Sequence, residues 1–390
     1  MLGSLISDMH LALQGPADRE KSSHRQRGHH GYDDHGADPD RWLPEEDSKE
    51  VLIVSRTRKP AATTLFTLVL LLAGLVGLVS CGGSATSRVA FPVSCSGSGP
   101  GLSGSGATRT IPVRVVHTTR STLVLVPVCL SGHGPYPFVL DTGATQSLVD
   151  RTLADQLQLT FTGTTTPATW VGCTRVADHV QVPSWSVGEV PLRPQTLTSL
   201  PMAKAPDGPS IVGLLGSDVW SRFGRFQLDY RVGQVLLPGP EQATAPSPAP
   251  PAAADPGPSA PGSQRVPITV IRNGAATLAV VPVTIDGLGP KRFALDTGSS
   301  NSVVDRNLAQ QLSLQPVGRP RNAAGVSCSA MSQPVHVASW RVGAVALPAQ
   351  NVDSIALPVP GLDGLLGSDV LYRFGTVTID YAAGSLVLGG

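Results

Sequence analysis

The chain contains the stretch Phe138-Val139-Leu140-Asp141-Thr142-Gly143-Ala144 and repeats it as Phe293-Ala294-Leu295-Asp296-Thr297-Gly298-Ser299. One Asp-Thr-Gly would be a weak signal, because such a tripeptide arises by chance about once in several thousand positions. Two copies, each behind the same apolar run, indicate an internal duplication, which is the first feature to read for architecture.

The duplication extends well beyond the motif. Residues 121–141 align without a gap on residues 276–296, an offset of 155 positions. Further along, Gly-Leu-Leu-Gly-Ser-Asp at 213–218 recurs at 364–369, at an offset of 151. The same offset relates two tripeptides near the ends of the repeats, Leu228-Asp229-Tyr230 and Ile379-Asp380-Tyr381. The second copy is therefore four residues shorter in its middle.

Local patterns within each repeat predict short strands. The runs 122–128 and 277–283 are rich in Val, Leu and Thr and are followed by Gly-containing turns, as in strand-hairpin-strand units. A short helical turn is expected near 153–159, and another at Ser217 and Ser368, whose hydroxyls could cap the backbone donors that follow. The predicted fold class is all-β with a few short helices.

The order of these motifs is similar to that of a known family. Asp-Thr-Gly behind two apolar residues, a loop of about 70 residues and Leu-Leu-Gly-Ser-Asp resemble the retropepsin-like aspartic peptidases, whose retroviral members are homodimers of one such unit. The resemblance covers about 111–237 and 266–390. It implies two retropepsin-like lobes that form a pseudo-dimer within one chain, and hence a monomer.

The two aspartates are the candidate catalytic residues. Two carboxyl groups held about 3 Å apart cannot both ionise, so they share a proton, and one can activate a water while the other protonates the substrate carbonyl. Asp141 and Asp296 are the candidates for this role, whereas the repeated Asp218 and Asp369 are expected to support the short helices. The resemblance implies an aspartic endopeptidase that acts on polypeptides with no metal and no organic cofactor.

Five neighbouring residues are expected to support the catalytic loops: Thr142, Gly143, Thr297, Gly298 and Ser299. The glycines let each loop turn tightly and bring its carboxylate close to its twin. By resemblance, the two threonines brace the loops against each other. Ser299 can donate a hydrogen bond to Asp296, whereas Ala144 offers none to Asp141, so we expect the shared proton on Asp141 and an acidic optimum of activity.

A protein without catalysis remains the alternative. Asp-Thr-Gly is also a good turn sequence, and an inactive lobe pair serving as a surface-binding or scaffold module would keep the same apolar pattern. The composition excludes one other class: 15% of residues are charged and the net charge is +1, with no basic cluster in the repeats, so nucleic acid is not an expected partner.

The regions outside the repeats predict export. We expect six segments along the chain: a disordered polar leader (1–60), a signal peptide with lipobox or a membrane anchor (61–81), a flexible Gly/Ser tether (82–110), lobe 1 (111–237), a Pro/Ala-rich linker (238–265) and lobe 2 (266–390). The apolar core of about 15 residues is short for a spanning helix, which needs about 20.

Residues Leu78-Val79-Ser80-Cys81 resemble a bacterial lipobox. This resemblance implies that Cys81 is lipidated and that the mature protein is membrane-anchored outside the cytoplasm, at the cell surface or on the periplasmic side. An uncleaved signal anchor is the alternative, and it also leaves the repeats facing outward.

Four further cysteines, Cys95, Cys129, Cys173 and Cys328, suit an oxidising compartment, and three pairings are open. Cys173 and Cys328 each lie 32 residues after their aspartate, where the family's flap hairpins are expected. We therefore predict a disulfide between the two flaps. The alternatives are that each is a small buried apolar residue, or that Cys95 and Cys129 pair alone.

Overall fold

The computed structural model describes residues 90–95, 108–118, 121–203, 210–238 and 262–389. The expected leader, the signal segment with Cys81 and most of the linker lie outside these residues. Within the described part, no helix is both long enough and apolar enough to cross a membrane. All of these residues fall in one compact unit of the chain.

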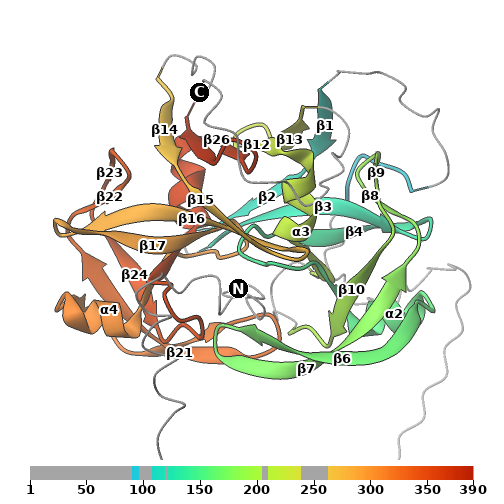
Figure 1. The fold of residues 1–390 in the computed structure, drawn as a ribbon, viewed down its shortest axis with the longest axis horizontal. Coiled ribbons are helices and arrows are strands. Elements are labelled where there is room, and N and C mark those ends of the chain that lie inside the picture. Colours follow the sequence, from blue (N-terminus) through green and yellow to red (C-terminus); the bar gives the residue numbers. More distant parts are fainter. Residues whose placement is uncertain (1–89, 96–107, 119–120, 204–209, 239–261, 390) are drawn as a thin grey trace, which may run out of the picture. The chain divides into compact units, whose positions relative to one another are not determined.

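Lobe 1 is a ten-stranded sheet (Figure 1). Its strands are β2 (Arg114–His117), β3 (Thr122–Leu130), β4 (His133–Leu140), β5 (Leu148–Asp150), β6 (Thr160–Trp170), β7 (Cys173–Val182), β8 (Trp185–Val187), β9 (Val190–Leu192), β10 (Gln195–Leu200) and β11 (Gly213–Leu215). The order is β6-β7-β10-β5-β11-β4-β3-β8-β9, with β2 paired to β3. The short helices are α2 (Arg151–Gln156), α3 (Ser217–Trp220) and η2 (Ser221–Phe223).

Lobe 2 repeats this plan with eleven strands. They are β15 (Thr269–Asn273), β16 (Ala276–Ile285), β17 (Leu288–Asp296), β18 (Val303–Asp305), β19 (Gln315–Pro316), β20 (Arg321–Ala324), β21 (Ser329–Val337), β22 (Trp340–Val342), β23 (Val345–Leu347), β24 (Gln350–Ile355) and β25 (Gly364–Gly367). The order is β19-β21-β24-β18-β25-β17-β16-β22-β23, with β15 paired to β16 and β20 to β21. Its helices are α4 (Arg306–Gln311), α5 (Ser368–Leu371) and η3 (Tyr372–Phe374).

A third sheet joins the two lobes. It contains β1 (Arg109–Pro112), β13 (Gln234–Leu237), β12 (Arg225–Asp229), β26 (Thr376–Asp380), β27 (Ser385–Leu388) and β14 (Gln264–Pro267), in that order. Three strands come from each half of the chain, and they meet where β12 pairs with β26. The register there, Arg225 opposite Asp380 and Asp229 opposite Thr376, fixes how the lobes face each other.

Local sequence explains the main elements. All nine residues of β3 are buried, which agrees with its uninterrupted apolar run, because a strand covered on both faces needs no polar alternation. Helix α2 begins where the Asp150 carboxylate accepts the backbone N–H groups of Thr152 and Leu153. Asp305 caps α4 in the same way. The predicted class, all-β with short helices in two similar lobes, is confirmed.

Candidate active site

Both aspartates lie at the ends of central strands. Asp141 follows the last residue of β4, and Asp296 ends β17. Beside each strand runs a parallel neighbour, β11 next to β4 and β25 next to β17, and the Asp141 N–H donates to the Leu215 carbonyl at 3.0 Å. The Leu-Leu-Gly segments thus form the apolar support behind the aspartate loops, in a packing role.

The carboxyl groups of Asp141 and Asp296 meet at the boundary between the lobes. They are 1% and 0% exposed, and each lies against the glycine of the opposite Asp-Thr-Gly loop. Asp296 Oδ2 has no N–H or hydroxyl donor among the described residues. Two buried carboxyl groups this close disfavour each other's ionisation, which favours a state in which one of them is protonated.

The inner oxygens of the pair are held by backbone amides. Asp141 Oδ1 accepts from the N–H groups of Gly143 at 3.1 Å and Ala144 at 2.8 Å. Asp296 Oδ1 accepts from Gly298 at 3.0 Å and Ser299 at 2.8 Å. These donors stabilise the ionised form of each carboxyl, which partly offsets the cost of burial.

Burial raises the proton affinity of both carboxyl groups. Burial, and secondarily the charge of Asp296, raises the pKa of Asp141 well above its ordinary value. Burial raises the pKa of Asp296 to about 6. Both carboxyl groups therefore hold a proton to a higher pH than an exposed aspartate does.

The reason that we gave for expecting the shared proton on Asp141 is wrong. The Ser299 hydroxyl donates to the Asn301 carbonyl at 2.6 Å, and only the Ser299 backbone N–H reaches Asp296. Ala144 supplies the equivalent N–H to Asp141. The serine side chain turned away because a neighbouring carbonyl offered a local acceptor, a competition that residue identity alone does not reveal.

The two threonines interlock the loops. Thr142 Oγ1 donates to the Leu295 carbonyl at 2.7 Å and accepts the Thr297 N–H at 3.1 Å. Thr297 Oγ1 donates to the Leu140 carbonyl at 2.8 Å and accepts the Thr142 N–H at 3.0 Å. All four bonds are buried and cross from one lobe to the other. At about 1 kcal/mol each, they fix the loops against each other.

Gly143 and Gly298 each face the opposite carboxyl. A Cβ on Gly143 would collide with the carboxyl carbon of Asp296, and one on Gly298 would collide with that of Asp141. Neither glycine has a positive φ angle. Close approach of the carboxyl groups, and not the tight turn we expected, therefore explains these two glycines.

The two serines of the Leu-Leu-Gly-Ser-Asp segments do not cap the short helices. Ser217 Oγ lies 2.8 Å from the Thr142 carbonyl, and Ser368 Oγ lies 2.9 Å from the Thr297 carbonyl. Helices α3 and α5 begin after Gly216 and Gly367 without a side-chain cap. Each serine contacts a catalytic loop instead, a role that the sequence analysis missed.

Two hairpins lie where the resemblance expects flaps. Hairpin 1 is formed by β6 and β7, and hairpin 2 by β20 and β21. A disulfide joins Cys173 to Cys328 across them, with 6.5 Å between the Cα atoms, as predicted. The Trp170 indole N–H lies 3.1 Å from Cys328 Sγ. A second disulfide joins Cys95 to Cys129 on β3.

The tip of each hairpin packs against the lobe opposite its own. Val171, 1% exposed, packs in an apolar cluster of lobe 2 that includes Val303 and Leu365. Val326, also 1% exposed, packs in the matching cluster of lobe 1 with Leu148 and Leu214. Burial of each valine contributes about 1.5–3 kcal/mol, so noncovalent packing reinforces the disulfide in holding the tips down.

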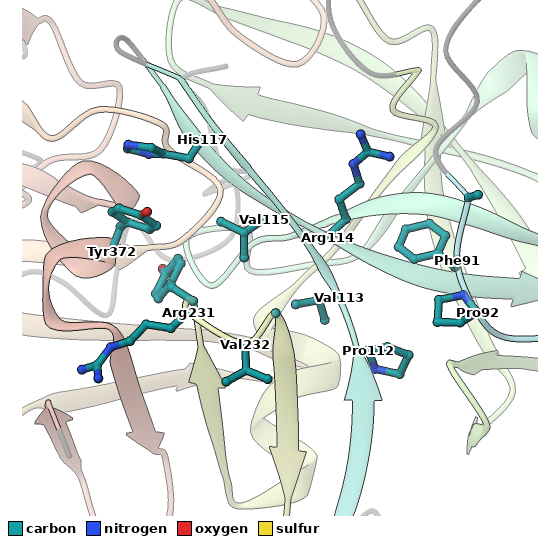
Figure 2. A pocket seen from close by; sticks show the side chains of 13 residues that line it. Phe91, Pro92, Pro112, Val113, Arg114, Val115, His117, Arg231, Val232 and Tyr372 are labelled. Carbon is teal, nitrogen blue, oxygen red and sulfur yellow. The ribbon is translucent and has the colours of Figure 1, made fainter.

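A separate pocket of about 460 Å³ borders the sheet that joins the lobes. Figure 2 shows Phe91 and Pro92 on one side of it and Tyr372 on the other. The ring of Tyr372 stacks on His117, with 4.1 Å between the ring centroids. Neither Asp141 nor Asp296 lines this pocket.

The chain is similar to known proteins in sequence and in structure. The aspartyl protease family model matches the chain twice, over residues 126–219 and 281–370. A crystal structure of a retropepsin-like aspartic protease from Rickettsia conorii is 20% identical, with a TM-score of 0.24, and the match covers 33% of this chain and 90% of that one. The crystal structure of edgp is 10% identical, with a TM-score of 0.36 and coverage of 74% and 96%. No curated protein matches significantly.

Proposed function

Both lobes of this chain match the aspartyl protease family, and from this premise we propose that it is an aspartic endopeptidase whose Asp141 and Asp296 act as one catalytic pair. Polypeptides are the substrates that the family implies. The observation that carries the proposal is a pair of buried carboxyl groups, each set against the Asp-Thr-Gly loop of the other lobe, whose pKa values are raised by burial.

In the proposed mechanism Asp141 holds the proton of the pair and Asp296 is ionised. The ionised Asp296 accepts a proton from a water, which attacks the carbonyl carbon of the scissile bond, while the protonated Asp141 donates to the carbonyl oxygen. The proton on Asp296 then passes to the leaving nitrogen as the tetrahedral intermediate collapses. Because one carboxyl must be charged and the other neutral, activity should follow a bell-shaped pH profile with the midpoint of its acidic limb near pH 6. Its optimum would then lie above pH 6 and be less acidic than the sequence suggested.

We further propose that the enzyme acts outside the cytoplasm, anchored to the membrane through lipidated Cys81. The lipobox-like residues support this location. The disulfides Cys95–Cys129 and Cys173–Cys328 support it independently, because such bonds persist in oxidising compartments.

The test is digestion of a peptide library by the full chain purified in detergent, with and without a dithiol reductant. We expect cleavage by the wild type and none by Asp141→Asn. The matched control is Asp155→Asn, which alters an exposed aspartate paired with Arg151 and should cleave as the wild type does. Absence of cleavage by the wild type in both redox conditions would reject the enzyme.

An inactive surface-binding module is the second candidate. The observation that favours it is the pair of hairpin tips, each of which packs in an apolar cluster of the opposite lobe and which a disulfide joins. In that case the library peptides would bind without being cut, and the reductant would change binding without producing fragments. Fragment detection by mass spectrometry separates the two functions.

A further inference from the structure

Two buried tyrosines cross the boundary between the lobes. Tyr230 follows β12 of lobe 1, and Tyr381 follows β26 of lobe 2; they are 3% and 1% exposed. The Tyr381 N–H donates to the Gly224 carbonyl of lobe 1 at 2.8 Å, and the Tyr230 N–H donates to the Gly375 carbonyl of lobe 2 at 2.7 Å. Each ring is thereby fixed on the lobe opposite its own.

The hydroxyl of each tyrosine reaches a serine behind the opposite catalytic loop. Tyr381 Oη lies 2.7 Å from Ser217 Oγ, and Tyr230 Oη lies 3.3 Å from Ser368 Oγ. Each serine has one hydroxyl hydrogen, which it donates to the carbonyl of its loop threonine, because a carbonyl can only accept. The tyrosine is therefore the donor to the serine in both halves.

The chain of hydrogen bonds continues to the carboxyl groups. The Thr142 carbonyl belongs to the same peptide unit as the Gly143 N–H, which donates to Asp141 Oδ1. A hydrogen bond accepted by a peptide carbonyl polarises the unit and strengthens the bond that its N–H donates. In lobe 2, the Thr297 carbonyl and the Gly298 N–H connect Ser368 to Asp296 Oδ1 in the same way.

We propose that Tyr381 and Tyr230 are positioning residues of the active site, each of which stabilises the ionised carboxyl of the other lobe through a serine and a peptide unit. The proposal rests on the proposed function for its catalytic meaning. Tyr381 acts on Asp141 and Tyr230 acts on Asp296. Since neither carboxyl is fully supported until both lobes are docked, the pair is completed only in the assembled fold.

The charged neighbours of the two tyrosines leave this assignment intact. Burial raises the pKa of both tyrosines, so they remain protonated donors at every working pH. Asp141, Asp218 and Arg272 lie near Tyr381, and Asp369 lies near Tyr230. A Tyr→Phe change removes only the hydroxyl and leaves these groups in place.

The experiment compares Tyr381→Phe and Tyr230→Phe with Tyr372→Phe, a control whose ring lies at the same boundary but stacks on His117. Carbon-13 NMR titration of the aspartate carboxyl groups reads their protonation without any substrate. Loss of a donor that favours the charged form raises a pKa, so Tyr381→Phe should raise the upper apparent pKa of the pair by about 0.2 unit. Tyr230→Phe should raise the lower one by less, because its bond is longer. In cleavage assays, Tyr381→Phe should move the basic limb of the pH profile upward, and Tyr230→Phe should move the acidic limb upward. Both variants should have a lower kcat and an unchanged KM.

Two outcomes overturn the proposal: titration curves of Tyr381→Phe that coincide with those of Tyr372→Phe, or full additivity of Tyr381→Phe with Ser217→Ala. Residues in one relay must be non-additive. Because the titration needs no turnover, a wild type that cleaves nothing would reject the proposed function while the relay itself is still judged by NMR.

Discussion

The two catalytic loops of this duplicated chain have matching hydrogen bonds, whereas the two hairpins differ in the lengths of their strands. Every hydrogen bond around Asp141 has a counterpart around Asp296, down to the serine behind each loop. The hairpins differ: β6 and β7 have 11 and 10 residues, whereas β20 has four and β21 nine. Two carboxyl groups can share a proton only if both loops keep one geometry, while the hairpins need only to meet at their tips.

The largest expected effect comes from breaking the symmetry of the loops. Gly143→Ala and Gly298→Ala each push a Cβ into the opposite carboxyl. Both should lower kcat/KM at least about 100-fold and destabilise the protein by about 1–3 kcal/mol. Peptide cleavage and urea unfolding measure the two effects.

The control is Gly132→Ala, at a positive φ but with open space around it, which should lose some stability and no activity. If either Gly143→Ala or Gly298→Ala keeps wild-type activity, close contact with the opposite carboxyl does not require glycine at that position.

The second prediction concerns stability against pH. The folded protein holds Asp296 with its pKa raised to about 6, whereas the unfolded chain has the ordinary value, so the folded state binds more protons between about pH 4 and pH 6. Stability should therefore fall as pH rises through this window. Asp296→Asn should remove that loss and raise the free energy of unfolding at pH 8 by about 3 kcal/mol.

Denaturant unfolding at pH 4 and pH 8 provides the measurement, with Asp155→Asn as the exposed control. Parallel pH dependences in wild type and Asp296→Asn would mean that the carboxyl is not buried as described.

A third prediction tests the hairpins. A dithiol reductant exchanges with the Cys173–Cys328 bond, giving two protein thiols and an oxidised dithiol, and frees the tips to leave their apolar clusters. We expect turnover of peptides to rise several-fold, and the double variant Cys173→Ser/Cys328→Ser to match the reduced wild type without reductant.

The other disulfide supplies the control. Cys95→Ser/Cys129→Ser should keep the response to reductant, because that bond lies outside the hairpins. Equal rates in reduced and oxidised wild type would show that closure of the hairpins does not limit access.

The smallest effect is expected at Ser299. Since its hydroxyl donates to the Asn301 carbonyl, Ser299→Ala should leave the acidic limb of the pH profile within about 0.2 unit of the wild type. The reciprocal Ala144→Ser tests whether the other loop behaves alike. A clear upward shift in Ser299→Ala would restore the side-chain bond to Asp296 that the sequence suggested.

The sequence alone predicted the fold class, the paired motifs and the equal spacing of Cys173 and Cys328, because these depend on the duplication and on local periodicity. It did not predict the contacts of the serines and tyrosines, which depend on how the lobes dock. Ser217 was expected to cap α3, and Tyr381 stood out only as a landmark of the repeat. The register of β12 on β26 brings them together, and no local pattern encodes that register. Recurrence of the Asp-Tyr pair at the end of both repeats was the available signal.

The Cys173–Cys328 bond spans 155 positions of the chain, and the whole segment 239–261 lies inside the ring that it closes. In the chain-entropy account, such a ring disfavours the unfolded state by about 5 kcal/mol. It also changes what a proteolytic cut can do. A protease that nicks the chain between the lobes would yield two fragments on a reducing gel but one species of unchanged mass, apart from an added water, under oxidising conditions. The nicked protein would remain a covalently joined two-chain molecule, held together independently of the backbone.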